Sequence, residues 1–147
     1  MAPAMKALLF SIGTRGDIEP FLALAEILQE KKWEVICIFP EPYRQQVEEI
    51  GLPFRGFSRE IMALMEGQQA RFLFGGEGSV LRRVWKLTGM ARKSLSLSKD
   101  SLALQHRIQV EEAPDLILYH PKCNYSVLWG MRHEAETILV NPTLDPL

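Results

Sequence analysis

Five short apolar segments, separated by longer stretches of mixed polar and apolar residues, set the pattern along this chain. They lie at residues 5–12, 33–39, 53–57, 115–120 and 137–140. Each has the length of a β-strand, and the second is rich in β-branched and aromatic residues. Because these runs are nearly continuous rather than alternating, the pattern predicts strands that are buried on both faces of a sheet.

Helical periodicity fills the stretches between the predicted strands. After the first strand, apolar residues recur at spacings of three and four, as on one face of a helix. These residues are Ile18, Phe21, Ala25 and Leu28. We expect Asp17 to cap this helix and Pro20 to lie in its first turn. Further helices are expected at residues 43–50, 79–112 and 125–132.

The alternation of strands and helices indicates an α/β fold. Continuous apolar strands joined by helices are typical of a parallel sheet covered on both faces. We therefore predict a Rossmann-like three-layer α/β/α sandwich with a mainly parallel sheet. With the strand order 3-2-1-4-5, ligands would bind beyond the carboxyl ends of the first and fourth strands. Residues 13–17 and 120–124 line that predicted site.

The composition narrows the class of protein further. The 147 residues suit one domain, and 17 basic against 18 acidic residues give a net charge of −1. That balance argues against nucleic-acid binding through bulk charge. The two cysteines form neither a disulfide framework nor a zinc site. No uncharged run is long enough to span a membrane and the first apolar run lacks a cleavage site, so we expect a cytoplasmic location.

The glycine turn at residues 13–17 is not a phosphate-binding loop of a common type. It lacks the third glycine of the dinucleotide fingerprint and the Gly-Lys-Ser/Thr ending of the phosphate loop. The carboxylate of Asp17 would also repel a pyrophosphate at the start of the following helix. The turn therefore argues against a phosphate cradle.

Instead, residues 13–20 are Gly-Thr-Arg-Gly-Asp-Ile-Glu-Pro, followed by Leu-Ala-Leu at 22–24 and Gly-Leu-Pro-Phe at 51–54. This pattern resembles the amino-terminal domain of GT-B glycosyltransferases of the family 28 and family 1 types. These types include sterol glucosyltransferases and glycopeptide-antibiotic glycosyltransferases, and their signature is roughly G-[ST]-R-G-D-[VI]-x-P, followed by L-A-L and G-L-x-F. The sequence matches that signature at Gly13, Thr14, Arg15, Gly16, Asp17, Ile18, Pro20, Leu22, Ala23, Leu24, Gly51, Leu52 and Phe54. The similarity is clear over residues 5–57, and residues 114–121 are compatible with it.

The resemblance implies transfer of a hexose from a nucleotide sugar, expected to be a UDP-sugar, to a hydroxyl of a lipid, sterol or other hydrophobic acceptor. The amino-terminal domain of such enzymes holds the acceptor, and a carboxy-terminal domain holds the donor. We expect residues 1–147 to be one acceptor-binding domain without that donor domain. The chain would then be part of a longer or two-chain enzyme and inactive by itself, with no cofactor of its own.

The resemblance also suggests two catalytic residues, Asp17 and His120. Plant-type relatives carry a histidine base three residues before the proline of this loop, where Asp17 stands relative to Pro20. Asp17 is therefore the candidate base that takes the proton of the acceptor hydroxyl. An aspartate at a helix start is equally a structural cap. His120 departs from the acidic residue of those relatives, and it could steer Asp17, bind the acceptor or hydrogen-bond within its loop.

A wider set of residues completes the candidate site. Substrate-binding candidates are Gly13, Thr14, Arg15, Gly16, Phe72, Trp85 and Asn124. No Asp-x-Asp pair occurs, so no metal site is expected. Residues 79–99 form a basic amphipathic segment, which could rest on an anionic membrane or be a solvated helix face.

Two other functional classes stay open. One is a non-catalytic scaffold that pairs with a separate donor-binding chain. The other is a free-standing nucleotide-binding domain in which Glu41, after the second predicted strand, contacts a ribose.

Overall fold

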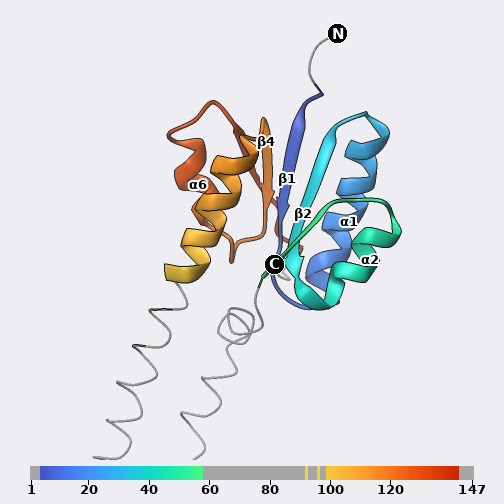
Figure 1. Ribbon diagram of the computed structural model, residues 1–147, viewed down its shortest axis with the longest axis horizontal. Coiled ribbons are helices and arrows are strands. Elements are labelled where there is room, and N and C mark those ends of the chain that lie inside the picture. The colour runs from blue at the N-terminus through green and yellow to red at the C-terminus, as the bar shows by residue number, and fades with distance from the viewer. Residues whose placement is uncertain (1–3, 58–91, 93–95, 97–98, 143–147) are drawn as a thin grey trace, which may run out of the picture.

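The computed structural model describes residues 4–57, 92, 96 and 99–142, and these residues form a sheet with helices on both faces (Figure 1). The five strands are all parallel, in the order β3-β2-β1-β4-β5. They are β1 (Lys6–Phe10), β2 (Glu34–Pro40), β3 (Phe54–Phe57), β4 (Leu116–Tyr119) and β5 (Glu136–Leu139). The predicted Rossmann-like fold and parallel sheet are thereby confirmed, and the strand order is the one assumed above for the candidate site.

Helices form the two outer layers. The labelled helices are α1 (Arg15–Glu30), η1 (Glu41–Tyr43), α2 (Arg44–Glu49) and α6 (Tyr125–Gly130), and residues 99–112 are also helical. Figure 1 shows α1 and α2 on one side of the sheet, with α6 and the helix of residues 99–112 on the other. In the part of the chain that the structure describes, no helix is long and apolar enough to cross a membrane.

Both faces of the sheet are buried, as the continuous apolar strands predict. Successive side chains of a strand point to opposite faces. On β1, Ala7 and Leu9 therefore pack in the core beneath α1, whereas Leu8 and Phe10 pack with Ile108 on the other face. After Lys6, every residue of β1 can be apolar because neither face of the strand is exposed to solvent there.

The start of α1 differs from the prediction. The helix begins at Arg15 with Thr14 as its N-cap, so Asp17 is the third helical residue and not the cap. Asp17 takes that position because its carboxylate reaches back and accepts the N–H of Thr14 at 2.8 Å, as in one half of a capping box. Pro20 lies in the second turn rather than the first, where it removes one helical hydrogen bond.

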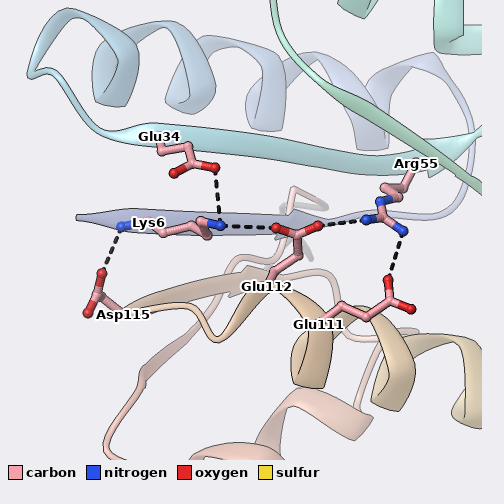
Figure 2. A network of polar contacts seen from close by, with 6 residues as sticks. All are labelled: Lys6, Glu34, Arg55, Glu111, Glu112 and Asp115. Carbon is pink, nitrogen blue, oxygen red and sulfur yellow. Dashed lines mark hydrogen bonds and ion pairs between the residues drawn. The ribbon is translucent and has the colours of Figure 1, made fainter. Parts of the chain in front are cut away.

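A network of charged side chains ties the end of the 99–112 helix to three strands. It consists of Lys6, Glu34, Arg55, Glu111, Glu112 and Asp115 (Figure 2). Glu112 is central, because its two oxygens lie 3.0 Å from Lys6 Nζ and 2.6 Å from Arg55 Nη2. Its side chain is only 14% exposed. Burial alone would raise the pKa of Glu112, but hydrogen bonds and charge from Lys6 and Arg55 hold that pKa below its usual range.

We expect Glu112→Gln to lower the free energy of unfolding at pH 7 by about 1–3 kcal/mol, because Lys6 and Arg55 would lose a half-buried charge partner. Urea denaturation measures this loss. The folded pKa of Glu112 is depressed, so its stabilisation is present above the ordinary carboxyl pKa of 4.5 and disappears as the pH falls through the folded pKa. The control is Glu26→Gln, on an exposed position of α1, which should change stability by less than about 0.5 kcal/mol. Equal losses in the two variants would contradict the role of the network.

Candidate functional site

The candidate site lies where β1 and β4 end side by side. β1 runs into the loop that starts α1, and β4 runs into residues 120–124 before α6. The two strands pair in parallel up to Phe10 opposite Tyr119, so their carboxyl ends meet at the same edge. The N–H of His120 continues this pairing by donating to the carbonyl of Phe10 at 2.8 Å. The sheet thus places the two predicted loops together.

Asp17 is held from its own loop. One carboxylate oxygen, Oδ2, accepts the N–H of Thr14 at 2.8 Å and the Thr14 hydroxyl at 3.1 Å. The buried Ser11 hydroxyl donates to the carbonyl of Asp17 at 3.0 Å, which fixes the first turn of α1. These contacts leave the other carboxylate oxygen facing the loop after β4.

His120 completes the pair from that second loop. Its Nε2 lies 3.5 Å from Asp17 Oδ1, and the residue is only 4% exposed. Its Nδ1 accepts the N–H of Lys122 at 3.2 Å, so in the neutral ring the proton is on Nε2 and faces Asp17. Burial lowers the pKa of His120, and the positive charge of Lys122 lowers it further, against the opposing effect of Asp17. Because the pKa of His120 is lowered from its ordinary value of 6.5, the neutral ring is favoured at pH 7, with its Nε2–H facing Asp17.

Gly13 makes room for the carboxylate. Its φ of +147° is a conformation that residues with a side chain rarely adopt. A Cβ built on Gly13 would also collide with the Asp17 carboxylate. A glycine is needed at this position for two independent reasons.

The remaining predicted site residues are not tied to the Asp17–His120 pair by a contact among the described residues. The Arg15 side chain is 79% exposed and pairs with Glu19 of its own helix. A Cβ on Gly16 would meet the Thr14 hydroxyl oxygen at 4.0 Å, an ordinary contact, and Asn124 precedes α6 without a side-chain capping bond. Phe72 and Trp85 lie outside the described residues, as does nearly all of the basic segment 79–99.

Two contributors to the site were missed at the level of sequence. Ser11 lies within the apolar run of residues 5–12, and a single hydroxyl at the end of a buried strand signals a specific hydrogen bond. The backbone N–H of Lys122 fixes the tautomer of His120, and no side-chain pattern encodes that contact. No group of three or more His, Cys, Asp or Glu side chains is placed to hold a metal ion in the part of the chain described.

With this fold and site in place, comparison with known proteins identifies the class. The profile of the glycosyltransferase family 28 N-terminal domain matches residues 7–118, and the chain belongs to this family. The match includes the loop of Asp17 and ends two residues before His120.

Curated relatives are similar over shorter stretches. The chain is 41% identical over 51 residues to O-mycaminosyltylonolide 6-deoxyallosyltransferase of Streptomyces fradiae, which is 35% of this chain and 12% of that protein. It is 38% identical over 66 residues to sterol 3-beta-glucosyltransferase UGT80B1 of Arabidopsis thaliana, which is 43% of this chain and 11% of that protein.

Solved structures share the fold over nearly the whole chain. The calicheamicin glycosyltransferase CalG4 superposes with a TM-score of 0.63 at 13% identity, over 99% of this chain and 32% of its own. The spinosyn rhamnosyltransferase SpnG, in complex with spinosyn aglycone, gives a TM-score of 0.57 at 18% identity, over 97% of this chain and 36% of its own. The chain therefore spans about a third of the length of these glycosyltransferases.

We expect Gly13→Ala to destabilise the protein by about 2–4 kcal/mol, because it adds a collision with Asp17 to a backbone strain of about 1–3 kcal/mol. Gly51→Ala is the matched control, since Gly51 also has a positive φ, of +76°, but its Cβ would meet nothing within 4 Å. Urea denaturation measures the loss of free energy of unfolding in both variants, and the excess loss in Gly13→Ala reports the collision with Asp17. Equal losses of stability in Gly13→Ala and Gly51→Ala would show that the Asp17 carboxylate does not need the space beside Gly13.

The buried, neutral His120 predicts a pH dependence of stability. Its folded pKa lies below the ordinary value of 6.5, so the unfolded chain takes up the proton first as the pH falls. Stability should decrease as the pH falls through about 6.5, by about 1.4 kcal/mol per pH unit, until the folded pKa is reached. In His120→Gln this fall in stability should be missing when the urea concentrations at half-unfolding are compared at pH 7.5 and pH 5. The control variant His133→Gln, at an exposed position, should keep the pH dependence of stability. An unchanged pH dependence in His120→Gln would refute its origin in His120.

Proposed function

We propose that this chain is the acceptor-binding part of a glycosyltransferase in which Asp17 is the catalytic base and His120 positions it. The observation that carries the proposal is the Asp17–His120 pair at the adjoining carboxyl ends of β1 and β4. Membership of the glycosyltransferase family supplies the reaction class. The contacts of Asp17 with Thr14 and with His120 support the proposed roles of base and positioning residue.

The proposed reaction is a displacement at the anomeric carbon of a nucleotide sugar. The acceptor hydroxyl gives its proton to the Asp17 carboxylate while its oxygen bonds to the anomeric carbon, and the nucleoside diphosphate leaves. Thr14 holds one oxygen of Asp17, and the Nε2–H of His120 orients the other. A neutral donor suits this task, because a full positive charge beside Asp17 would weaken it as a base.

The donor is proposed to bind on a further domain, in the same chain or in a partner. Support comes from length, because this chain covers only 32–39% of the solved glycosyltransferases that it resembles. A UDP-sugar is the proposed donor. The Asp17 carboxylate would repel a diphosphate at the start of α1, which supports a donor site on the further domain.

The acceptor is proposed to be a hydrophobic molecule with a free hydroxyl, such as a lipid or a sterol. Two names among the similar proteins support this class, since one is a sterol glucosyltransferase and another is in complex with a spinosyn aglycone. Phe72 and Trp85 remain the candidates for its apolar contacts, and residues 79–99 remain a candidate for membrane contact. The alternative of a free-standing nucleotide-binding domain is disfavoured, because the turn at residues 13–17 lacks the dinucleotide fingerprint.

The decisive test begins with the reading frame downstream of Leu147 in the source genome. If a donor domain is encoded there, the joined enzyme can be assayed with UDP-sugars and hydrophobic acceptors. We expect Asp17→Asn to lower kcat by about 10²–10⁴-fold with a small change in KM, because the proton acceptor is removed and the shape is kept.

Glu26→Gln, which removes an exposed carboxylate from the same helix, should leave kcat unchanged. The isolated chain should transfer no sugar. An unchanged kcat in Asp17→Asn would refute the base, and transfer by the isolated chain would refute the need for a donor domain. If no donor domain is encoded in frame or nearby, the scaffold hypothesis is favoured instead.

A further inference from the structure

A cleft, here called the α6 cleft, opens where the helix of residues 99–112 meets α6 on the side of the sheet away from α1 (Figure 1). Its volume is about 360 Å³, which is near the lower end of the range for small-molecule sites. Its walls come from both helices and from the turn that follows α6. None of the lining residues belongs to the loops at 13–17 and 120–124 that form the candidate site.

Four rings hold one wall of the α6 cleft in place. Trp129 is 6% exposed, and the ring of His133 stacks on its indole with the centroids 3.7 Å apart. The ring of His106 meets the same indole at an angle of 67°, with the centroids 6.1 Å apart. The hydroxyl of Tyr125 lies 2.6 Å from Nδ1 of His106. Because these contacts already order the rings, a ligand would bind there at a small cost in side-chain entropy.

The lining of the α6 cleft has hydrogen-bond donors to spare. Arg132 lines the cleft and has no ion-pair partner among the described residues. The imidazole of His133 carries at least one N–H in either charge state. The buried Nε1 of Trp129 also has no hydrogen-bond partner in the part of the chain that the structure describes. Buried donors are normally satisfied, so an acceptor is missing where Trp129 borders the cleft.

The charge around Trp129 separates into two places. None of the described carboxylates lines the α6 cleft, where Arg132 supplies a positive charge. A second hollow shares Trp129 and His133 with the cleft and is lined by Asp115, Glu134 and Glu136. An anion is therefore attracted to the α6 cleft and repelled from the neighbouring hollow.

The rest of the lining is apolar. Leu128 is 56% exposed and Met131 is 79% exposed, and both line the α6 cleft. We propose that this cleft is a binding site for a small organic carboxylate with an apolar body, with its carboxylate beside Arg132 and His133 and its body against Leu128 and Met131. The planar guanidinium of arginine matches the two oxygens of a carboxylate. The proposal does not depend on the roles of Asp17 and His120, so its test can fail without affecting the proposed function.

NMR of the chain with isotope-labelled tryptophan tests the site with para-ethylbenzoate as the probe. The indole N–H signals of Trp129 and Trp33 are assigned from Trp129→Phe and Trp33→Phe. Titration should move the Trp129 signal in a saturable way, while Trp33, which packs on the opposite face of the sheet, should not respond. The neutral isostere para-ethylbenzamide should bind at least about fivefold more weakly, because it lacks the charge. Acetate, which lacks the apolar body, should leave the Trp129 signal unmoved at the same concentration.

Two variants separate the contributions of charge and apolar contact. Arg132→Gln should weaken the binding of para-ethylbenzoate by about fivefold and leave that of the amide unchanged. Leu128→Asn should weaken both probes, because the apolar body contacts this side chain. The control is Arg107→Gln, at an exposed position on the helix of residues 99–112 that does not line the cleft, and it should bind as the wild type does.

Three results would overturn the proposal. The first is a Trp129 signal that does not move at millimolar concentrations of para-ethylbenzoate. The second is equal affinity for para-ethylbenzoate and its amide, which would show that the cleft does not select a carboxylate. The third is an unchanged affinity in Arg132→Gln, or an equal loss in Arg107→Gln, which would show that Arg132 is not the partner of the carboxylate.

Discussion

The parallel pairing of β1 with β4 is the constraint on which the rest of this structure depends. It places Phe10 opposite Tyr119, and the N–H of His120 extends the ladder by one more bond to Phe10. Two loops that are more than a hundred residues apart in the sequence therefore leave the sheet side by side. The amino ends of the same strands bring Lys6 next to Asp115, whose carboxylate accepts the N–H of Lys6 at 2.7 Å.

The two ends of this strand pair serve different purposes. At the amino ends, charges of opposite sign satisfy one another through Glu112, so that network stabilises the packing of the helix on the sheet. At the carboxyl ends, Asp17 has one oxygen held by Thr14 and another that faces a neutral imidazole. A carboxylate that is oriented but not paired with a full charge keeps its capacity to accept a proton. This contrast is the physical reason to place the proposed proton transfer at the carboxyl ends of β1 and β4.

The Asp17–His120 pair also gives a simple account of a departure from plant-type relatives. Those enzymes, as the resemblance implies, carry a histidine in the first loop and an acidic residue in the second. Here the acid is in the first loop and the imidazole in the second, 3.5 Å apart, so the proposed pair would have its positions exchanged. In the proposed arrangement the carboxylate acts on the acceptor, and the imidazole orients it.

Local sequence determined the elements of this protein, and tertiary structure decided how they act together. Continuous apolar runs predicted the five strands and a parallel sheet, because a strand covered on both faces carries few polar residues. The order of the strands is set by pairing between segments far apart in the sequence. The pattern around Asp17 and Pro20 misplaced the start of α1, because a side chain that reaches back to Thr14 competes with capping in a way that spacing does not reveal. The distance between Asp17 and His120, the tautomer of His120 and the α6 cleft came only from the folded chain. Each depends on contacts between residues far apart in sequence, and no local pattern encodes such contacts.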